Sequence, residues 1–306
     1  MGCRARAWWL AGLVALAWGG AAQAGALRFC DRPAELSADQ QDKLFRFGSI
    51  IKAELERSGQ SVALIARSGL DLSRFGVRYS HAGLSLKASE NTAWSVRQLY
   101  YACDERKPRI YDQGMSGFVL GLEAPEIGYV SVVFLPPAEG AALERAALSN
   151  RQTLQLLGAT YSANAYPFSQ RYQNCNQWVI ELLAAAWGRL GADPDDAQAQ
   201  RAQAQAWLRS QGYRPSELAV NSRPLMWAGA FIPWLHNDDH PPEDIAQMTY
   251  RVSMPASIEA FVQAQVPGAT RVEFCHTDRY VVVRRGWELI PEGCEPGAQD
   301  TVIALD

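Results

Sequence analysis

Histidine is scarce in this sequence: only 4 of the 306 residues can supply an imidazole as a proton acceptor or metal ligand. A surplus of basic residues is also absent, since 29 Lys and Arg residues stand against 32 Asp and Glu residues. Because the phosphates of nucleic acid call for a basic face, this balance argues against a nucleic-acid partner. No glycine-rich phosphate-binding loop is present either, and no other pattern indicates a cofactor.

Long apolar runs are lacking beyond the N-terminus. Residues 7–18 are apolar and follow two arginines, but this run is too short to anchor a chain across a bilayer. Small residues ending at Ala24 have the pattern of a signal-peptidase site, so residues 1–24 are predicted to be a cleaved secretory signal. The later apolar stretch over residues 225–235 is short and contains Pro233. We therefore expect a soluble, exported protein without a transmembrane segment after signal removal, periplasmic in a Gram-negative source.

Signal removal would leave five of the six cysteines. Cysteines tend to pair in an oxidising compartment, and an odd number leaves one outside the disulfides. Cys275 and Cys294 flank a predicted hairpin and loop and are natural partners, which leaves Cys30 and Cys103 as the second pair. Four cysteines allow three pairings, so this connectivity stays open. The remaining residue is Cys175, which stands in a polar stretch at the start of a predicted helix.

The hydrophobic patterns predict an α+β fold. Apolar residues at helical spacing indicate helices, and alternating or β-branched runs indicate strands. The predicted helices cover residues 36–59, 140–158, 174–190, 193–212 and 255–266, and the predicted strands cover residues 61–69, 77–86, 93–103, 129–137, 248–254, 270–276 and 279–286. We expect residues 25–190 to form the core. Residues 191–306 would form a helical linker and a smaller αβ region, packed with the core as one domain or separate from it.

The chemistry of a catalytic thiol matches the surroundings of Cys175. A thiol has a pKa of about 8.5, which a helix N-terminus and an imidazolium can lower. Asn174 is a good N-cap for the predicted helix, so Cys175 would lie at its first turn. His81 lies on a predicted strand, with Gly83 leaving room beside it, and could act as the base. Gln98 has the matching alternation on the next strand and could orient the ring.

Other polar residues near Cys175 could assist. The side chains of Asn174 and Asn176, or of Gln173, could bind an oxyanion together with the backbone N–H of Cys175. Tyr172 belongs to an aromatic cluster that could form one wall of a groove, or could simply pack within its loop.

The stretch "HNDDH" over residues 236–240 has the appearance of a metal site. His236 and His240 are four residues apart, a spacing that suits zinc on a helix. Prolines on both sides argue against a helix, so the two imidazoles would not share a face. We therefore predict no metal here, and a loop in which Asp239 or His240 binds backbone groups.

The segments "RYSHAGLSL" and "PFSQRYQNCNQWVIELLAAA" resemble an uncharacterised bacterial family, the domain of unknown function numbered 2145, and the similarity covers nearly the whole chain after the signal. A strand histidine followed about 94 residues later by a helix-start cysteine is also similar to the circularly permuted NlpC-type papain-like superfamily. That superfamily includes peptidase-like, amidase-like and lipid acyltransferase proteins. The resemblance implies a permuted papain-like core with Cys175 as nucleophile, His81 as base and Gln98 as orienting group. Permuted relatives often carry a histidine or a carboxylate at the third position.

The sequence thus predicts an exported cysteine hydrolase or acyltransferase that works through a thioester. The substrate would be an amide or an ester, in a peptide, a peptidoglycan or a lipid. The alternative is a non-catalytic envelope protein that binds a ligand or a partner in the same groove.

Overall fold

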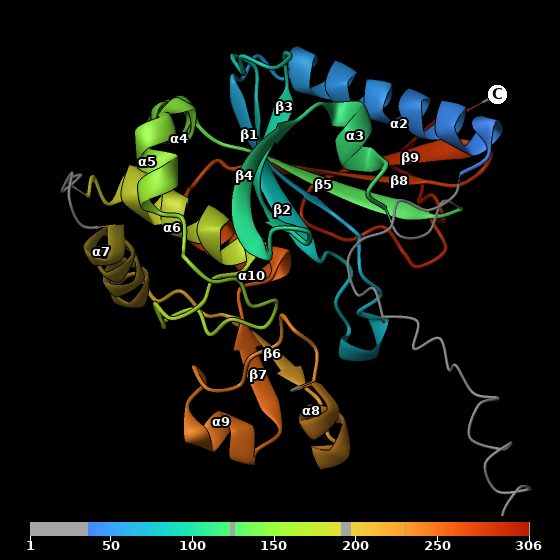
Figure 1. Cartoon of the computed structure of the whole chain (residues 1–306). Helices are drawn as coiled ribbons and strands as arrows, with labels where there is room; N and C mark the ends of the chain where they lie inside the picture. The colour runs from blue at the N-terminus through green and yellow to red at the C-terminus, as the bar shows by residue number, and fades with distance from the viewer. Residues whose placement is uncertain (1–35, 123–125, 191–196, 230, 306) are drawn as a thin grey trace, which may run out of the picture. The chain divides into compact units, whose positions relative to one another are not determined.

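The computed structural model describes residues 36–122, 126–190, 197–229 and 231–305, which all belong to one compact unit. Its central feature is an eight-stranded antiparallel sheet in the order β10-β9-β8-β5-β1-β2-β3-β4 (Figure 1). The strands are β1 (Val62–Arg67), β2 (His81–Leu86), β3 (Ser95–Ala102), β4 (Lys107–Gln113), β5 (Gly128–Phe134), β8 (Thr270–His276), β9 (Tyr280–Arg285) and β10 (Thr301–Ala304). Because β8 pairs with β5, the last strands of the chain extend the same sheet that the first strands begin.

Helices cover both faces of the sheet (Figure 1). One face is covered by α2 (Ala38–Arg57) and α3 (Met115–Val119). The other is covered by α4 (Pro137–Leu148), α6 (Cys175–Trp187) and α10 (Pro255–Gln265), with α5 (Asn150–Gln155) and α7 (Ala197–Ser210) packed against α4 and α6. A two-stranded sheet of β6 (Ser216–Ala219) and β7 (Thr249–Val252) is accompanied by α8 (Arg223–Gly229) and α9 (Pro242–Ala246).

The two faces have separate apolar cores because successive side chains of a strand point to opposite sides. On β1, Leu64 packs on the α6 side and Ile65 on the α2 side. On β2, Ala82 and Leu84 pack on the α6 side, so the alternate position His81 belongs to the α3 side. This alternation decides where the candidate base points.

The predicted α+β class is confirmed. The local patterns also identified most elements, including α2, whose first turn has the capping box of Ser37 and Gln40. Strand β4 was not predicted, since it is an edge strand with Pro108 and several exposed positions, and edge strands do not need a continuous apolar pattern. The predicted helix over residues 140–158 is two helices, because Ser149 is extended and caps α5.

The predicted signal over residues 1–24 and Cys30 lie outside the described residues. Among the residues that are described, no helix is both long enough and apolar enough to cross a membrane.

Gly83 is needed for the close approach of β2 and β3. A Cβ at this position would lie 2.5 Å from Val96 Cγ1 and 3.0 Å from the carbonyl oxygen of Arg97. We expect Gly83→Ala to lower the free energy of unfolding by about 1–3 kcal/mol, because the added methyl overpacks this contact. Urea denaturation measures the change. Gly140→Ala is the matched control: its Cβ would meet no atom closer than 3.8 Å near the start of α4, so stability should stay equal or rise.

Candidate active site

Cys175 is the first residue of α6, and its sulfur is not in a disulfide. The N-cap is Asn174, whose Oδ1 accepts a hydrogen bond from the backbone N–H of Gln177 at 2.6 Å. The amide nitrogen of Asn174 donates to the carbonyls of Ala163 (3.2 Å) and Ser253 (3.4 Å). The thiol therefore lies where the N-terminal N–H groups of a 13-residue helix concentrate positive charge, in a setting that is only 8 % exposed.

His81 and Gln98 lie together. The Nε2 atom of His81 is 2.6 Å from Oε1 of Gln98, and Nε2 of Gln98 donates to Oε1 of Gln113 at 2.6 Å. This series of hydrogen bonds assigns the proton of a neutral imidazole to Nε2, because the atom of Gln98 that faces the ring is its oxygen, which accepts. The other ring nitrogen, Nδ1, then carries a lone pair and can accept a proton. Gln113, on the unpredicted strand β4, completes the series.

Asn176 connects the start of α6 to the strand that carries His81. Its Oδ1 accepts from the N–H of Ala82 at 2.9 Å, and its Nδ2 donates to the carbonyl of Ser80 at 3.0 Å. This edge of β2 is open because the pairing between β2 and β3 runs only from Leu86 to Leu84. The residue that follows Cys175 thus holds both peptide groups that flank His81, although α6 packs on one face of the sheet and the His81 ring contacts Phe118 of α3 on the other.

The electrostatic surroundings keep His81 neutral. Burial and the positive charge of Arg67 lower the pKa of His81 to about 3, against a smaller opposite effect of the Gln98 hydrogen bond. Arg67 is the cross-strand partner of His81 on β1, and its guanidinium donates to the carbonyl of Gly121 and lies 5.4 Å from the ring centroid of Phe118. At neutral pH the imidazole is therefore a base without charge, which disfavours a resting thiolate–imidazolium pair.

A buried ion pair stabilises the loop before Cys175, and the sequence analysis did not predict this pair. Glu181, fully buried on α6, binds Nε of Arg201 on α7 at 2.8 Å. Gln173, Gln177 and Gln205 also donate to its carboxylate, at distances of 2.6, 3.1 and 2.8 Å. The sequence contains a hint of this pair: Glu181 is the single charged residue of the apolar helix α6, and Arg201 stands between Ala and Gln residues in α7.

The 236–240 loop supports the loop before α6 through polar contacts. Tyr172 stacks on His236 with ring centroids 4.3 Å apart, and its hydroxyl is 3.4 Å from Oδ2 of Asp238. Asp239 accepts from the N–H of Tyr166 at 2.9 Å, and Nε2 of His240 lies 2.7 Å from the carbonyl of Asn164. Within the described ranges, no group of three or more His, Cys, Asp or Glu side chains is arranged to hold a metal ion.

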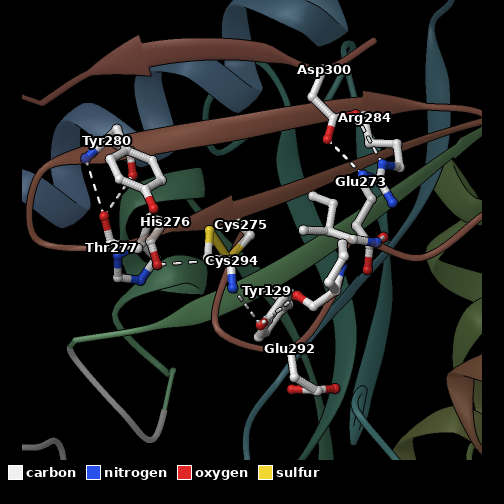
Figure 2. Close-up of a disulfide and its surroundings, with 12 residues drawn as sticks. Tyr129, Glu273, Cys275, His276, Thr277, Tyr280, Arg284, Glu292, Cys294 and Asp300 are labelled. Atoms are coloured by element: carbon white, nitrogen blue, oxygen red, sulfur yellow. Dashed lines mark hydrogen bonds and ion pairs between the residues drawn. A yellow bond between two sulfur atoms is a disulfide. The ribbon is translucent and has the colours of Figure 1, made fainter. Parts of the chain in front are cut away.

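The predicted disulfide between Cys275 and Cys294 is confirmed. Figure 2 shows it joining β8 to the loop beyond β9, with the backbone N–H of Cys294 donating to the hydroxyl of Tyr129 at 3.2 Å. Cys103 is also disulfide-bonded, but its predicted partner Cys30 lies outside the described residues.

These features define an α+β protein in which the start of a cysteine-bearing helix is tied through Asn176 to the backbone on either side of a strand histidine, on a large antiparallel sheet. Residues 54–262 match the model of a family described as "Uncharacterized protein conserved in bacteria (DUF2145)", and this chain belongs to that family. The matched range contains His81, Gln98 and Cys175 and ends before the Cys275–Cys294 disulfide. No curated protein and no solved structure matches the chain.

Proposed function

We propose that this protein is an exported cysteine hydrolase or acyltransferase that transfers acyl groups through a thioester on Cys175. The observation that carries the proposal is the double hydrogen bond from Asn176 to Ser80 and Ala82, which ties the helix start that carries Cys175 to the two peptide groups flanking His81. The hydrogen bond between His81 and Gln98 adds an oriented base. The order of these elements along the chain supports a permuted papain-like arrangement.

The proposed reaction uses His81 as a general base. The step requires the His81 ring and the Cys175 thiol to meet at the open edge of β2, since helix α6 and the ring contact opposite faces of the sheet. Nδ1 of His81 then takes the thiol proton while Sγ of Cys175 attacks the carbonyl carbon of the substrate. The N–H groups at the start of α6 stabilise the oxyanion. Collapse breaks the bond to the amine or alcohol, which leaves with the proton from Nδ1. Water, or another acceptor, then gives its proton to Nδ1 and attacks the thioester carbonyl, and the thiol is restored.

Each of the remaining predicted residues has a defined part in this proposal. Gln98 keeps the Nε2 proton in place but, being neutral, stabilises the transient imidazolium less than a carboxylate would. Asn176 is a positioning residue, since both polar atoms of its amide bind the backbone of β2. The amides of Asn174 and Gln173 are engaged with the helix N-terminus, neighbouring carbonyls and Glu181. The oxyanion site is therefore assigned to backbone N–H groups.

The substrate class follows from the proposed location. An exported enzyme of this type would meet amide bonds in peptides and peptidoglycan and ester bonds in lipids, and these are the substrates we propose. The rival function is non-catalytic binding in the same place. The small exposed fraction of Cys175, 8 %, favours that rival.

The experiment that tests the proposal is covalent capture with p-nitrophenyl acetate. We expect a burst of p-nitrophenol and an acetyl group mapped to Cys175 by peptide mass spectrometry, because an activated thiol accumulates the thioester. Cys175→Ala should abolish both signals. Cys275 and Cys294 cannot react, since they form a disulfide. A folded native protein that gives neither burst nor adduct would contradict the enzyme proposal and support the binding protein.

A further inference from the structure

The two most exposed large apolar side chains of the described residues lie in one short segment. Trp227 on α8 is 71 % exposed and Phe231 is 70 % exposed, and their rings meet edge to face with centroids 5.0 Å apart. Leu225, on the same helix, is 40 % exposed. We call these three residues the Trp227 surface. Isolated exposed apolar residues are common, but two aromatic rings and a leucine within seven residues form a patch.

Folding does not account for the Trp227 surface. Met226 is the buried residue of α8, so this helix already has an inward-facing apolar side chain. The Trp227 and Phe231 rings pack on each other while most of their surface meets solvent. Removing them from the surface would therefore leave the described cores intact, and their exposure calls for a partner.

Charge indicates which partner fits. Residues 222–235 contain one charged residue, the exposed Arg223, and no acidic residue, although acidic residues exceed basic residues in the whole chain. Trp and Phe partition to the boundary between headgroups and acyl chains, and an adjacent arginine attracts anionic lipids. We propose that the Trp227 surface and Arg223 dock this protein onto an anionic lipid membrane.

The segment that follows the Trp227 surface is hydrogen-bonded to the loop before Cys175. The N–H of Ala163 donates to the carbonyl of Trp234 at 2.8 Å, and the N–H of His236 donates to Oγ of Ser162 at 3.2 Å. A membrane bound at the Trp227 surface would thus contact a segment that is continuous with the wall of the candidate site. The docking itself does not rest on the proposed acyl transfer.

The test is sedimentation of the full chain with vesicles of phosphatidylglycerol and phosphatidylcholine, compared with vesicles of phosphatidylcholine alone. We expect stronger binding to the anionic vesicles. The double variant Trp227→Ser/Phe231→Ser should lose at least about tenfold in partition coefficient, given the transfer free energy of two aromatic side chains. Arg223→Gln should lower binding to the anionic vesicles by about fivefold and leave binding to phosphatidylcholine unchanged.

Matched controls separate docking from general hydrophobicity and from catalysis. Leu154→Ser changes another exposed apolar residue, at 57 % exposure, and should bind vesicles as the native chain does. The apolar run over residues 7–18 is common to all variants and cannot produce a difference between them. Cys175→Ala should also bind the vesicles as the native chain does. Membrane docking can therefore be confirmed or contradicted whether or not the protein transfers acyl groups.

A second measurement tests whether the indole of Trp227 enters the lipid. Trp227→Phe should keep most of the binding but lose part of the tryptophan fluorescence that brominated lipids quench in the native protein. Equal vesicle binding by the native chain and the double variant would overturn the proposal. A native chain that binds neither kind of vesicle would also overturn the proposal. The same holds if the Trp227 surface mediates self-association in the absence of lipid and the chain does not bind vesicles.

Discussion

Replacing His81 by alanine is expected to lower the rate of Cys175 acylation by p-nitrophenyl acetate by about 10²- to 10⁴-fold, the usual contribution of a general base. The proposed reason is that His81 is neutral with its Nε2 proton held by Gln98, so that its other nitrogen is available as a proton acceptor. Stopped-flow measurement of the p-nitrophenol burst gives the rate. Gly140→Ala should leave it unchanged, because Gly140 follows Glu139, whose carbonyl binds Trp187 at the opposite end of α6 from Cys175. An equal rate in native and His81→Ala proteins would exclude His81 as the base.

The pH dependence of the same burst tests the direction of the pKa shift of His81. Because the pKa of His81 is lowered to about 3, the base form persists on acidification, and the acylation rate should stay level from pH 7 down to about pH 5. Gln98→Glu would place a negative charge beside Nε2, raise the pKa of His81 and move the acidic fall in rate to higher pH. A native rate that halves near pH 6.5 would show an ordinary histidine and contradict this electrostatic description.

The shift in pKa also affects stability. The unfolded chain would protonate His81 near its ordinary pKa of 6.5, while the folded protein keeps it neutral down to about pH 3. The unfolded state therefore binds more protons between these values, and the contribution of His81 to stability falls as the pH drops through 6.5. His276, whose pKa burial lowers to about 4, acts in the same direction. Acidification should therefore lower the free energy of unfolding at pH values where His81 of the folded protein is still neutral.

Arg201→Met is expected to lower the free energy of unfolding by about 3–5 kcal/mol, because it leaves the carboxylate of Glu181 buried without its cation. The same change removes the bonds from Arg201 to the carbonyls of Gln170 and Tyr172 (both 3.0 Å), which hold the loop before Cys175. Urea denaturation measures the loss. We also expect slower acylation in the variant that remains folded, since that loop positions the start of α6.

Lys87→Met is the matched control for this buried pair. Lys87 and Glu56 form an ion pair of 3.0 Å in which both side chains are about half exposed, at 48 % and 44 %. Exposed pairs contribute at most about 1 kcal/mol, so this variant should unfold almost as the native protein does. A loss below about 1 kcal/mol for Arg201→Met would mean that Glu181 is stabilised mainly by its three glutamine donors.

The sequence predicted the elements whose patterns are local. Ser37 and the apolar spacing that follows it identified α2, and the polar stretch before an apolar helix located the start of α6 at Cys175. Strands β4 and β10 were missed because they lie at the two edges of the sheet, where few apolar residues are required. The Cys275–Cys294 disulfide followed from a hairpin that brings its ends together, and the structure confirms it.

Part of the candidate site was also accessible from the sequence. Alternation on two neighbouring strands was enough to select Gln98 as the residue beside His81, and the structure places them 2.6 Å apart. The catalytic roles of these residues, and of Cys175, remain proposals that the burst experiment decides. The metal-like spacing of His236 and His240 illustrates the opposite case, since the two rings have different partners: Tyr172 for His236 and the Asn164 carbonyl for His240.

The sequence by itself determined the α+β class, the family, the helix-start cysteine and the strand histidine, because composition, periodicity and capping act within short stretches of chain. Only the tertiary structure decided that Asn176 reaches an open edge of β2, that Arg67 lies across from His81, and that Glu181 meets Arg201. These contacts join residues 20 to 96 positions apart or depend on which face of the sheet a side chain occupies. Such relations arise from strand order and register, which no local pattern specifies.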